Sequence, residues 1–247
     1  LFLFQRGEDV AQVGFCGELD RRLGKAEALR VVEERYGIPS ERVCAVGDAD
    51  NDLPMLRAAG LGVAMGNALP EIQAEADLVI GAGDFCNTRE GLDEAMEMLR
   101  GIMAPMIVVP GNAESVEELR AAARPNMTVL HGQSTEAAGL RVFGLGYGVP
   151  VTPFGAWSCD LSEAEAEKML AGAEGCDLLV THSPPKGVAD VTSGGQSVGS
   201  IAIRDAIARF QPKIALCGHI HDSWGRSGKI GDTAVHNLGP KPNWFEI

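Results

Sequence analysis

Short apolar blocks alternate with amphipathic blocks along this chain, and the two kinds of block predict strands and helices. In the N-terminal part, apolar runs predict buried parallel strands at 42–46, 61–65 and 78–81. Apolar residues at helical spacing predict helices at 25–36, 53–59 and 69–76. This alternation is typical of a parallel sheet with helical crossovers. We therefore expect an α/β fold that begins with a partial Rossmann-like segment.

The same pattern continues after residue 84. Helices are predicted at 91–99, 116–123, 162–170 and 201–210. Strands are predicted at 106–109, 128–131, 140–146, 178–181 and 214–217, with further strand-like pieces in the C-terminal tail. Ser162, followed by Glu165, has the spacing of a capping box and marks a helix start.

Composition and charge narrow the class of protein. Apolar residues make up 45% of the 247 residues and charged residues 22%, as in ordinary globular proteins. The net charge of -13 opposes binding to nucleic acids and anionic membranes. No apolar run reaches the roughly 18 residues of a membrane span, and the opening run at 1–4 is too short for a signal-peptide core. The six cysteines form no C-x-x-C pair, so we expect free thiols and a cytoplasmic location.

Polar residues of metal-ligand type follow four predicted strands. They are Asp84, Asn112, His182, and the pair His219 and His221. Ligands of open α/β sheets bind outside the carboxyl ends of the strands, so these side chains are expected to converge. Imidazole nitrogens and carboxylate or amide oxygens suit Mn, Fe, Ni or Zn.

Each of these residues alone has a simpler interpretation. Asp84 and Asn112 stand in turn sequences, and a histidine at a strand end is often only hydrogen-bonded. Their occurrence together, each at a strand end, favours a metal site.

The segments Gly83-Asp84, Gly111-Asn112, Thr181-His182 and Gly218-His219-Ile220-His221 resemble motifs of the calcineurin-like metallophosphoesterases, over about residues 76–247. The resemblance implies a four-layer α/β/β/α sandwich with one or two divalent ions and a metal-activated hydroxide that attacks phosphorus. Asp84 would bridge the ions. Asn112, His182 and His219 would complete one site, and His221 would belong to the other. Asp84, Asn112 and His182 would also be the catalytic residues.

Two positions depart from the family pattern. The strand predicted at 61–65 occupies the place of the family's first motif but carries neither its Asp nor its His, and Ala113 replaces the usual His after Asn112. An alternative is therefore a catalytically impaired metal-binding protein or a chimera.

A second group of polar residues lies near the N-terminus: Lys25, Asp48, Asn51 and Asp52. Clustered carboxylates with a lysine suit Mg²⁺ and a phosphoryl group, although an acidic turn that caps a helix fits as well. The stretch 47–68, with Gly24-Lys25, resembles the C-terminal part of Cof-type haloacid dehalogenase-like phosphatases, over about residues 14–76. That family's nucleophilic Asp is not matched upstream, so a relic Mg²⁺ site without catalysis is expected.

These inferences divide the chain into a partial haloacid dehalogenase-like segment at 1–76 and a metallophosphoesterase domain at 77–247. The expected function is hydrolysis of phosphomonoesters or phosphodiesters of small molecules. A haloacid dehalogenase-like, Mg²⁺-dependent phosphatase fragment is a further alternative. A natural fusion, an engineered chimera and a misjoined reading frame would all produce such a sequence.

Overall fold

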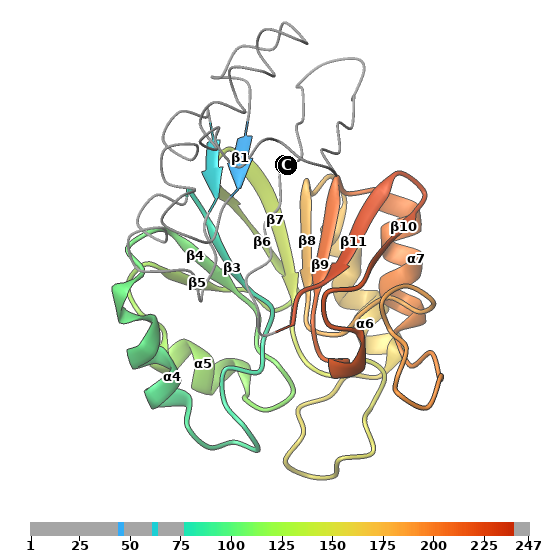
Figure 1. Cartoon of the computed structure of the whole chain (residues 1–247), viewed down its shortest axis with the longest axis horizontal. Helices are drawn as coiled ribbons and strands as arrows, with labels where there is room; N and C mark the ends of the chain where they lie inside the picture. Colours follow the sequence, from blue (N-terminus) through green and yellow to red (C-terminus); the bar gives the residue numbers. More distant parts are fainter. Residues whose placement is uncertain (1–43, 47–60, 64–76, 240–247) are drawn as a thin grey trace, which may run out of the picture. The chain divides into compact units, whose positions relative to one another are not determined.

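The computed structural model describes residues 44–46, 61–63 and 77–239 (Figure 1). Strands β1 (Cys44–Val46) and β2 (Leu61–Val63) pair in parallel as a two-stranded sheet of their own. Both strands were predicted, with longer bounds. The helices predicted at 25–36, 53–59 and 69–76 lie outside the described residues.

Strand β3 (Val79–Gly81) belongs to a different sheet from β2. The prediction that the strand at 61–65 takes the place of a first strand beside that of Asp84 stays a prediction. Within its own sheet β3 pairs with the segment of β4, because the Val109 N–H donates to the Gly81 carbonyl at 2.9 Å.

The first sheet of the larger unit has the order β3-β4-β5. Strands β4 (Met106–Val108) and β5 (Met127–Val129) run parallel. Helices α4 (Leu92–Met98) and α5 (Val116–Ala122) contact each other, and α5 also contacts β5. A short 3-10 turn, η3 (Leu99–Gly101), follows α4.

The second sheet has six strands in the order β10-β11-β9-β8-β7-β6. Its central strands β11, β9, β8 and β7 are parallel, and the two edge strands pair antiparallel. The bounds are β6 Gln133–Ala137, β7 Leu140–Leu145, β8 Leu178–Thr181, β9 Ile214–Cys217, β10 Ser227–Ile230 and β11 Thr233–Asn237. The helical elements are α6 Glu163–Leu170, η4 Ala171–Ala173, α7 Ile201–Phe210 and η5 His221–Ser223.

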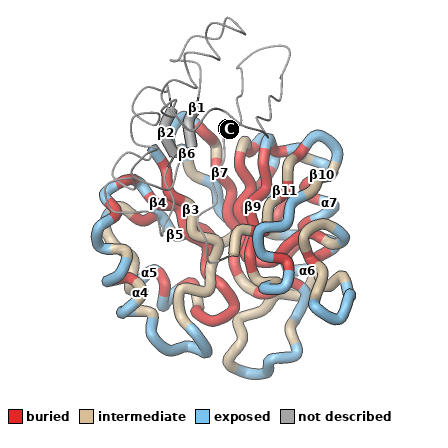
Figure 2. Tube along the Cα trace, in the orientation of Figure 1, coloured by how far each residue is buried: buried red, intermediate tan, exposed pale blue. Residues whose placement is uncertain are grey.

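Both faces of this second sheet are covered. Alternate residues such as Phe143, Leu179 and Ala215 form one apolar core with α6 and α7. The opposite face meets the first sheet at Gly144, where an added Cβ would lie 2.5 Å from the Leu130 Cβ. Figures 1 and 2 show the buried central strands with helices outside them. The larger unit is thus the expected α/β/β/α sandwich.

Strand β6 was not predicted. Its sequence, Gln-Ser-Thr-Glu-Ala, has no apolar alternation, because it is an exposed edge strand. It forms through antiparallel pairing with β7 across Ala138-Gly139, both with positive φ (49° and 74°), as in tight hairpin turns. Other predicted elements agree more closely, including the capping box at Ser162. No helix in the described part of the chain is long and apolar enough to cross a membrane.

Helix α7 offers a test of the core. Ile203 is fully buried, whereas Ile201 of the same helix is 55% exposed. We expect Ile203→Ala to lower the free energy of unfolding by about 2–5 kcal/mol, because it leaves a cavity. The matched control Ile201→Ala is expected to stay within about 0.5 kcal/mol in urea denaturation. Equal losses in the two variants would contradict this packing.

His131 makes the free energy of unfolding depend on pH. Its Nδ1 accepts from the Gly146 N–H at 3.3 Å, and burial, with Arg120 nearby, lowers its pKa to about 4. An unfolded chain protonates this histidine near pH 6.5, so its contribution to stability is present above that pH and is lost as the pH falls toward 4.

His131→Asn keeps an acceptor but does not titrate in this range. We expect the wild type to lose about 1–2 kcal/mol more stability than the variant between pH 7 and pH 4, after allowance for partial solvent exposure. Urea denaturation at both pH values measures the difference; parallel pH profiles would refute the assignment.

Candidate metal centre

Four loops at the ends of strands carry the polar residues of the site. Asp84 follows β3, Asn112 follows β4, His182 follows β8, and His219 follows β9. Asp84, His182 and His219 each offer a ligand atom, and these three atoms all lie within 4.8 Å of one another. The structure therefore brings together residues that lie far apart in the sequence.

The ring of His182 is held in one orientation. Its side chain is 1% exposed, and its Nδ1 lies 2.7 Å from the Ala82 carbonyl oxygen. A carbonyl oxygen only accepts, so Nδ1 carries the proton and donates it. The Nε2 atom is left with a free lone pair, as in histidines that bind metals.

Further ligand-type atoms surround this Nε2. Asn112 Oδ1 lies at 3.2 Å, His219 Nδ1 at 3.1 Å and Asp84 Oδ1 at 3.5 Å. The Asn112 amide is oriented by its Nδ2, which donates to Ser158 Oγ at 3.0 Å. The carboxylate and the amide oxygen accept only, so in the neutral ring protonated at Nδ1 no proton lies between them and Nε2.

A divalent cation bound among these acceptor atoms would offset the repulsion between them. Neighbouring ligands about 2.1 Å from an ion in octahedral or tetrahedral geometry lie roughly 3.0–3.4 Å apart. The distances from His182 Nε2 to its three neighbours, 3.1–3.5 Å, are close to this range. Burial, and next the neighbouring His182, lower the pKa of His219 to about 3, so this imidazole is neutral at pH 7, the form that binds metals. The residues fit a divalent ion held by nitrogen and oxygen.

Glycines allow the loops to approach this closely. A Cβ on Gly83 would lie 2.6 Å from the Gly111 backbone and from His182 Nδ1, and one on Gly111 would lie 2.1 Å from Asp84. Asp84 and His219 themselves adopt positive φ angles of 57° and 64°. Such left-handed conformations in non-glycine residues are uncommon, and they re-aim both side chains at the end of a strand.

Glu114 is a positioning residue that the sequence did not identify as one. Its carboxylate is fully buried and accepts from the Gly111 N–H at 2.6 Å and the Cys86 N–H at 3.4 Å. Burial raises the pKa of this carboxyl. Glu114 thereby ties the loop of Asp84 to the loop of Asn112. The only sequence signal is a carboxylate two residues after Pro-Gly-Asn.

His221 does not join the group. It opens η5, is exposed, and its ring lies against Trp224 with centroids 4.2 Å apart. The turn before it is held by Asn237, whose Nδ2 lies 3.1 Å from the Gly218 carbonyl oxygen and 3.2 Å from that of Ile220. The N-terminal candidates Lys25, Asp48, Asn51 and Asp52 lie outside the described residues.

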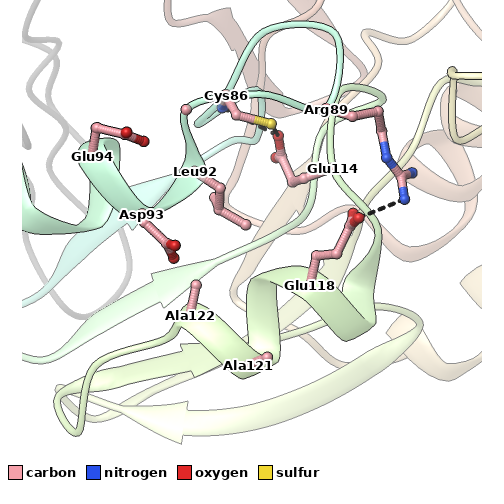
Figure 3. A pocket seen from close by; sticks show the side chains of 10 residues that line it. Cys86, Arg89, Leu92, Asp93, Glu94, Glu114, Glu118, Ala121 and Ala122 are labelled. Atoms are coloured by element: carbon pink, nitrogen blue, oxygen red, sulfur yellow. Dashed lines mark hydrogen bonds and ion pairs between the residues drawn. The ribbon is translucent and has the colours of Figure 1, made fainter.

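A cavity of about 390 Å³ is lined in part by Glu114 (Figure 3). Four carboxylates line it, against one guanidinium, and that guanidinium is paired: Arg89 Nη2 lies 2.7 Å from Glu118 Oε1. The carboxylates are those of Asp93, Glu94, Glu114 and Glu118. Such a lining repels phosphate, so this cavity is a poor candidate for a phosphoester site.

Sequence comparisons find similarity to two families in different parts of the chain. Calcineurin-like phosphoesterase matches residues 59–223, and haloacid dehalogenase-like hydrolase matches residues 19–87. The human metallophosphoesterase domain-containing protein 1 is 34% identical over 121 residues, 47% of this chain and 35% of that protein. Phosphoglycolate phosphatase of Methanopyrus kandleri is 45% identical over 75 residues, 30% of this chain and 32% of that protein. The chain thus spans about a third of the length of these relatives.

A solved structure, TT1561 of Thermus thermophilus, has the same fold. It superposes with a TM-score of 0.54 at 17% identity and covers 72% of this chain and 88% of its own. The phosphoesterase match covers more than half of the chain and contains Asp84, Asn112, His182 and His219. On this evidence the chain belongs to the calcineurin-like phosphoesterase family.

Proposed function

We propose that this chain is a metal-dependent hydrolase of phosphomonoester or phosphodiester bonds in small phosphorylated molecules. The observation that carries the proposal is that ligand atoms of Asp84, Asn112 and His219 lie 3.1–3.5 Å from His182 Nε2. Membership of the phosphoesterase family and the similarity to phosphatases support the same reaction class.

In this proposal Asp84, Asn112, His182 and His219 hold one divalent ion, of Mn, Fe, Zn or Ni. His221, at the start of η5, would contribute with Asp84 to the binding of a second ion. A bound divalent ion supplies Lewis-acid activation of water and neutralises charge on the phosphate oxygens.

The chain's own residues keep this arrangement rigid. The Ala82 carbonyl fixes the His182 ring, and the Ala113 N–H donates to Asp84 Oδ1 at 3.1 Å. Two ligands are therefore oriented by backbone groups before any substrate binds, which lowers the cost of reorganisation during the reaction.

For the N-terminal part we propose a division at residues 1–76 and 77–247. The first part would keep a haloacid dehalogenase-like Mg²⁺ site at Lys25, Asp48, Asn51 and Asp52 without its own catalysis. Cys86, Cys159, Cys176 and Cys217 are free thiols, which favours a reducing compartment such as the cytoplasm.

A second candidate function is metal binding without hydrolysis. It is favoured by the position of His221 outside the group of three ligand residues and by Ala113 next to Asn112. The alternative predicts metal content equal to that of an enzyme but no turnover.

Metal content is the first test. Protein purified without chelator is expected to contain about one Mn or Zn per chain or more, and His182→Ala to weaken binding at least tenfold, because the ligand and its oriented tautomer are both lost. Asp205→Asn, an exposed change on α7, is the control. Metal analysis and competition with a chelator give the values; wild-type content below about 0.3 per chain would refute the site.

Activity is the second test. With Mn²⁺ loaded, the wild type is expected to hydrolyse p-nitrophenyl phosphate or its bis ester. Asp84→Asn should lower kcat about a hundredfold, because it removes the carboxylate that stabilises the ion and its charge. Release of nitrophenol is recorded by its absorbance, with Asp205→Asn as the control. Full metal loading without turnover of either ester would leave the metal-binding alternative.

A further inference from the structure

An aromatic pair stands beside the candidate metal centre, in the loop between β7 and α6. The rings of Phe154 and Trp157 stack at 5.6 Å with an angle of 10° between their planes. Phe154 is nevertheless 50% exposed. An exposed aromatic ring offers a surface on which a further flat ring can stack.

The loop is attached directly to the ligand residue Asn112. The Cys159 N–H donates to the Asn112 carbonyl at 2.9 Å, and the Asn112 Nδ2 donates to Ser158 Oγ at 3.0 Å. The same residue that contributes an oxygen to the candidate metal centre therefore also anchors the loop that carries the aromatic pair.

Internal hydrogen bonds stiffen the loop further. Asp160 accepts from Ser158 Oγ at 3.0 Å and from Thr152 Oγ1 at 2.9 Å, which closes the loop across its base. The position of Phe154 is thus set by polar contacts at both ends of its segment.

The Phe154 ring lies next to one of the candidate metal ligands. Phe154 and His219 lie edge to face, with ring centroids 6.4 Å apart and an angle of 67°. A phosphate held next to His219 would place the group on its ester oxygen against Phe154. This short separation suits a ring attached directly to the ester oxygen.

We propose that Phe154, supported by Trp157, determines specificity for aryl phosphate esters by stacking on the aromatic leaving group. The inference rests on the proposed hydrolase function and adds its substrate class. Phe154 contacts the leaving group and takes no part in metal binding.

The test compares O-phosphotyrosine with O-phosphoserine, which differ in the aromatic ring. Phe154→Ala is expected to lower kcat/KM for O-phosphotyrosine about threefold to tenfold and to change that for O-phosphoserine less than about twofold. Phe154→Leu keeps an apolar side chain without a ring, and should show most of the same loss. Val151→Ala, also exposed and in the same loop, is the matched control and should change neither value.

A binding measurement separates this inference from the proposed hydrolysis. With Mn²⁺ loaded, calorimetry should show that phenylphosphonate binds more tightly than methylphosphonate, and that Phe154→Ala removes most of the difference. If the wild type hydrolyses neither amino-acid ester but this preference is present and depends on Phe154, the stacking site stands and the proposed hydrolysis fails. An equal effect of Phe154→Ala on both phosphonates, or on both phosphate esters, would overturn the stacking proposal.

Discussion

Three ligand-type atoms, from Asn112, His219 and Asp84, lie within 3.5 Å of His182 Nε2. The surrounding loops are arranged so that these atoms can approach this closely. The hydrogen bond from His182 Nδ1 to the Ala82 carbonyl fixes the tautomer. Asn112 and Asp84 then approach from two other strands as pure acceptors. A divalent cation among these atoms would be bound by their lone pairs, and it would offset the repulsion between neighbouring acceptors.

This close approach explains the glycines and the backbone conformations nearby. Gly83 and Gly111 leave no room for a Cβ, since each would place one within 2.6 Å of the opposing loop. The positive φ angles of Asp84 and His219 are uncommon for residues with a side chain, and they are supported by the surrounding contacts. Glu114, buried between the two loops, adds a second connection below the ligands. The backbone conformation of these loops therefore determines the positions of the ligand atoms.

The same constraint links the metal centre to its surroundings. Asn112 faces the ligands through Oδ1 and anchors the following loop through Nδ2 and its carbonyl. A change in the ligand cluster would therefore shift the loop of the aromatic pair, and a change in that loop would shift the ligand Asn112. His221 is held apart by its contact with Trp224, so the two histidines of the Gly-His-Ile-His segment have different surroundings. The chain turns at His219, so the two histidines do not lie on one extended strand.

The sequence by itself determined the α/β class, most helices and strands of the larger unit, and the strand-end residues that gather at the candidate site. These follow from local patterns: apolar runs, capping boxes and polar residues at strand ends are visible in short windows. Only the tertiary structure decided which sheet β3 joins, because strand pairing depends on distant partners. It also decided the existence of the polar edge strand β6, the role of Glu114 and the position of His221. None of them follows from apolar periodicity: β6 depends on pairing with β7, Glu114 on contacts with two loops, and His221 on a turn held by Asn237.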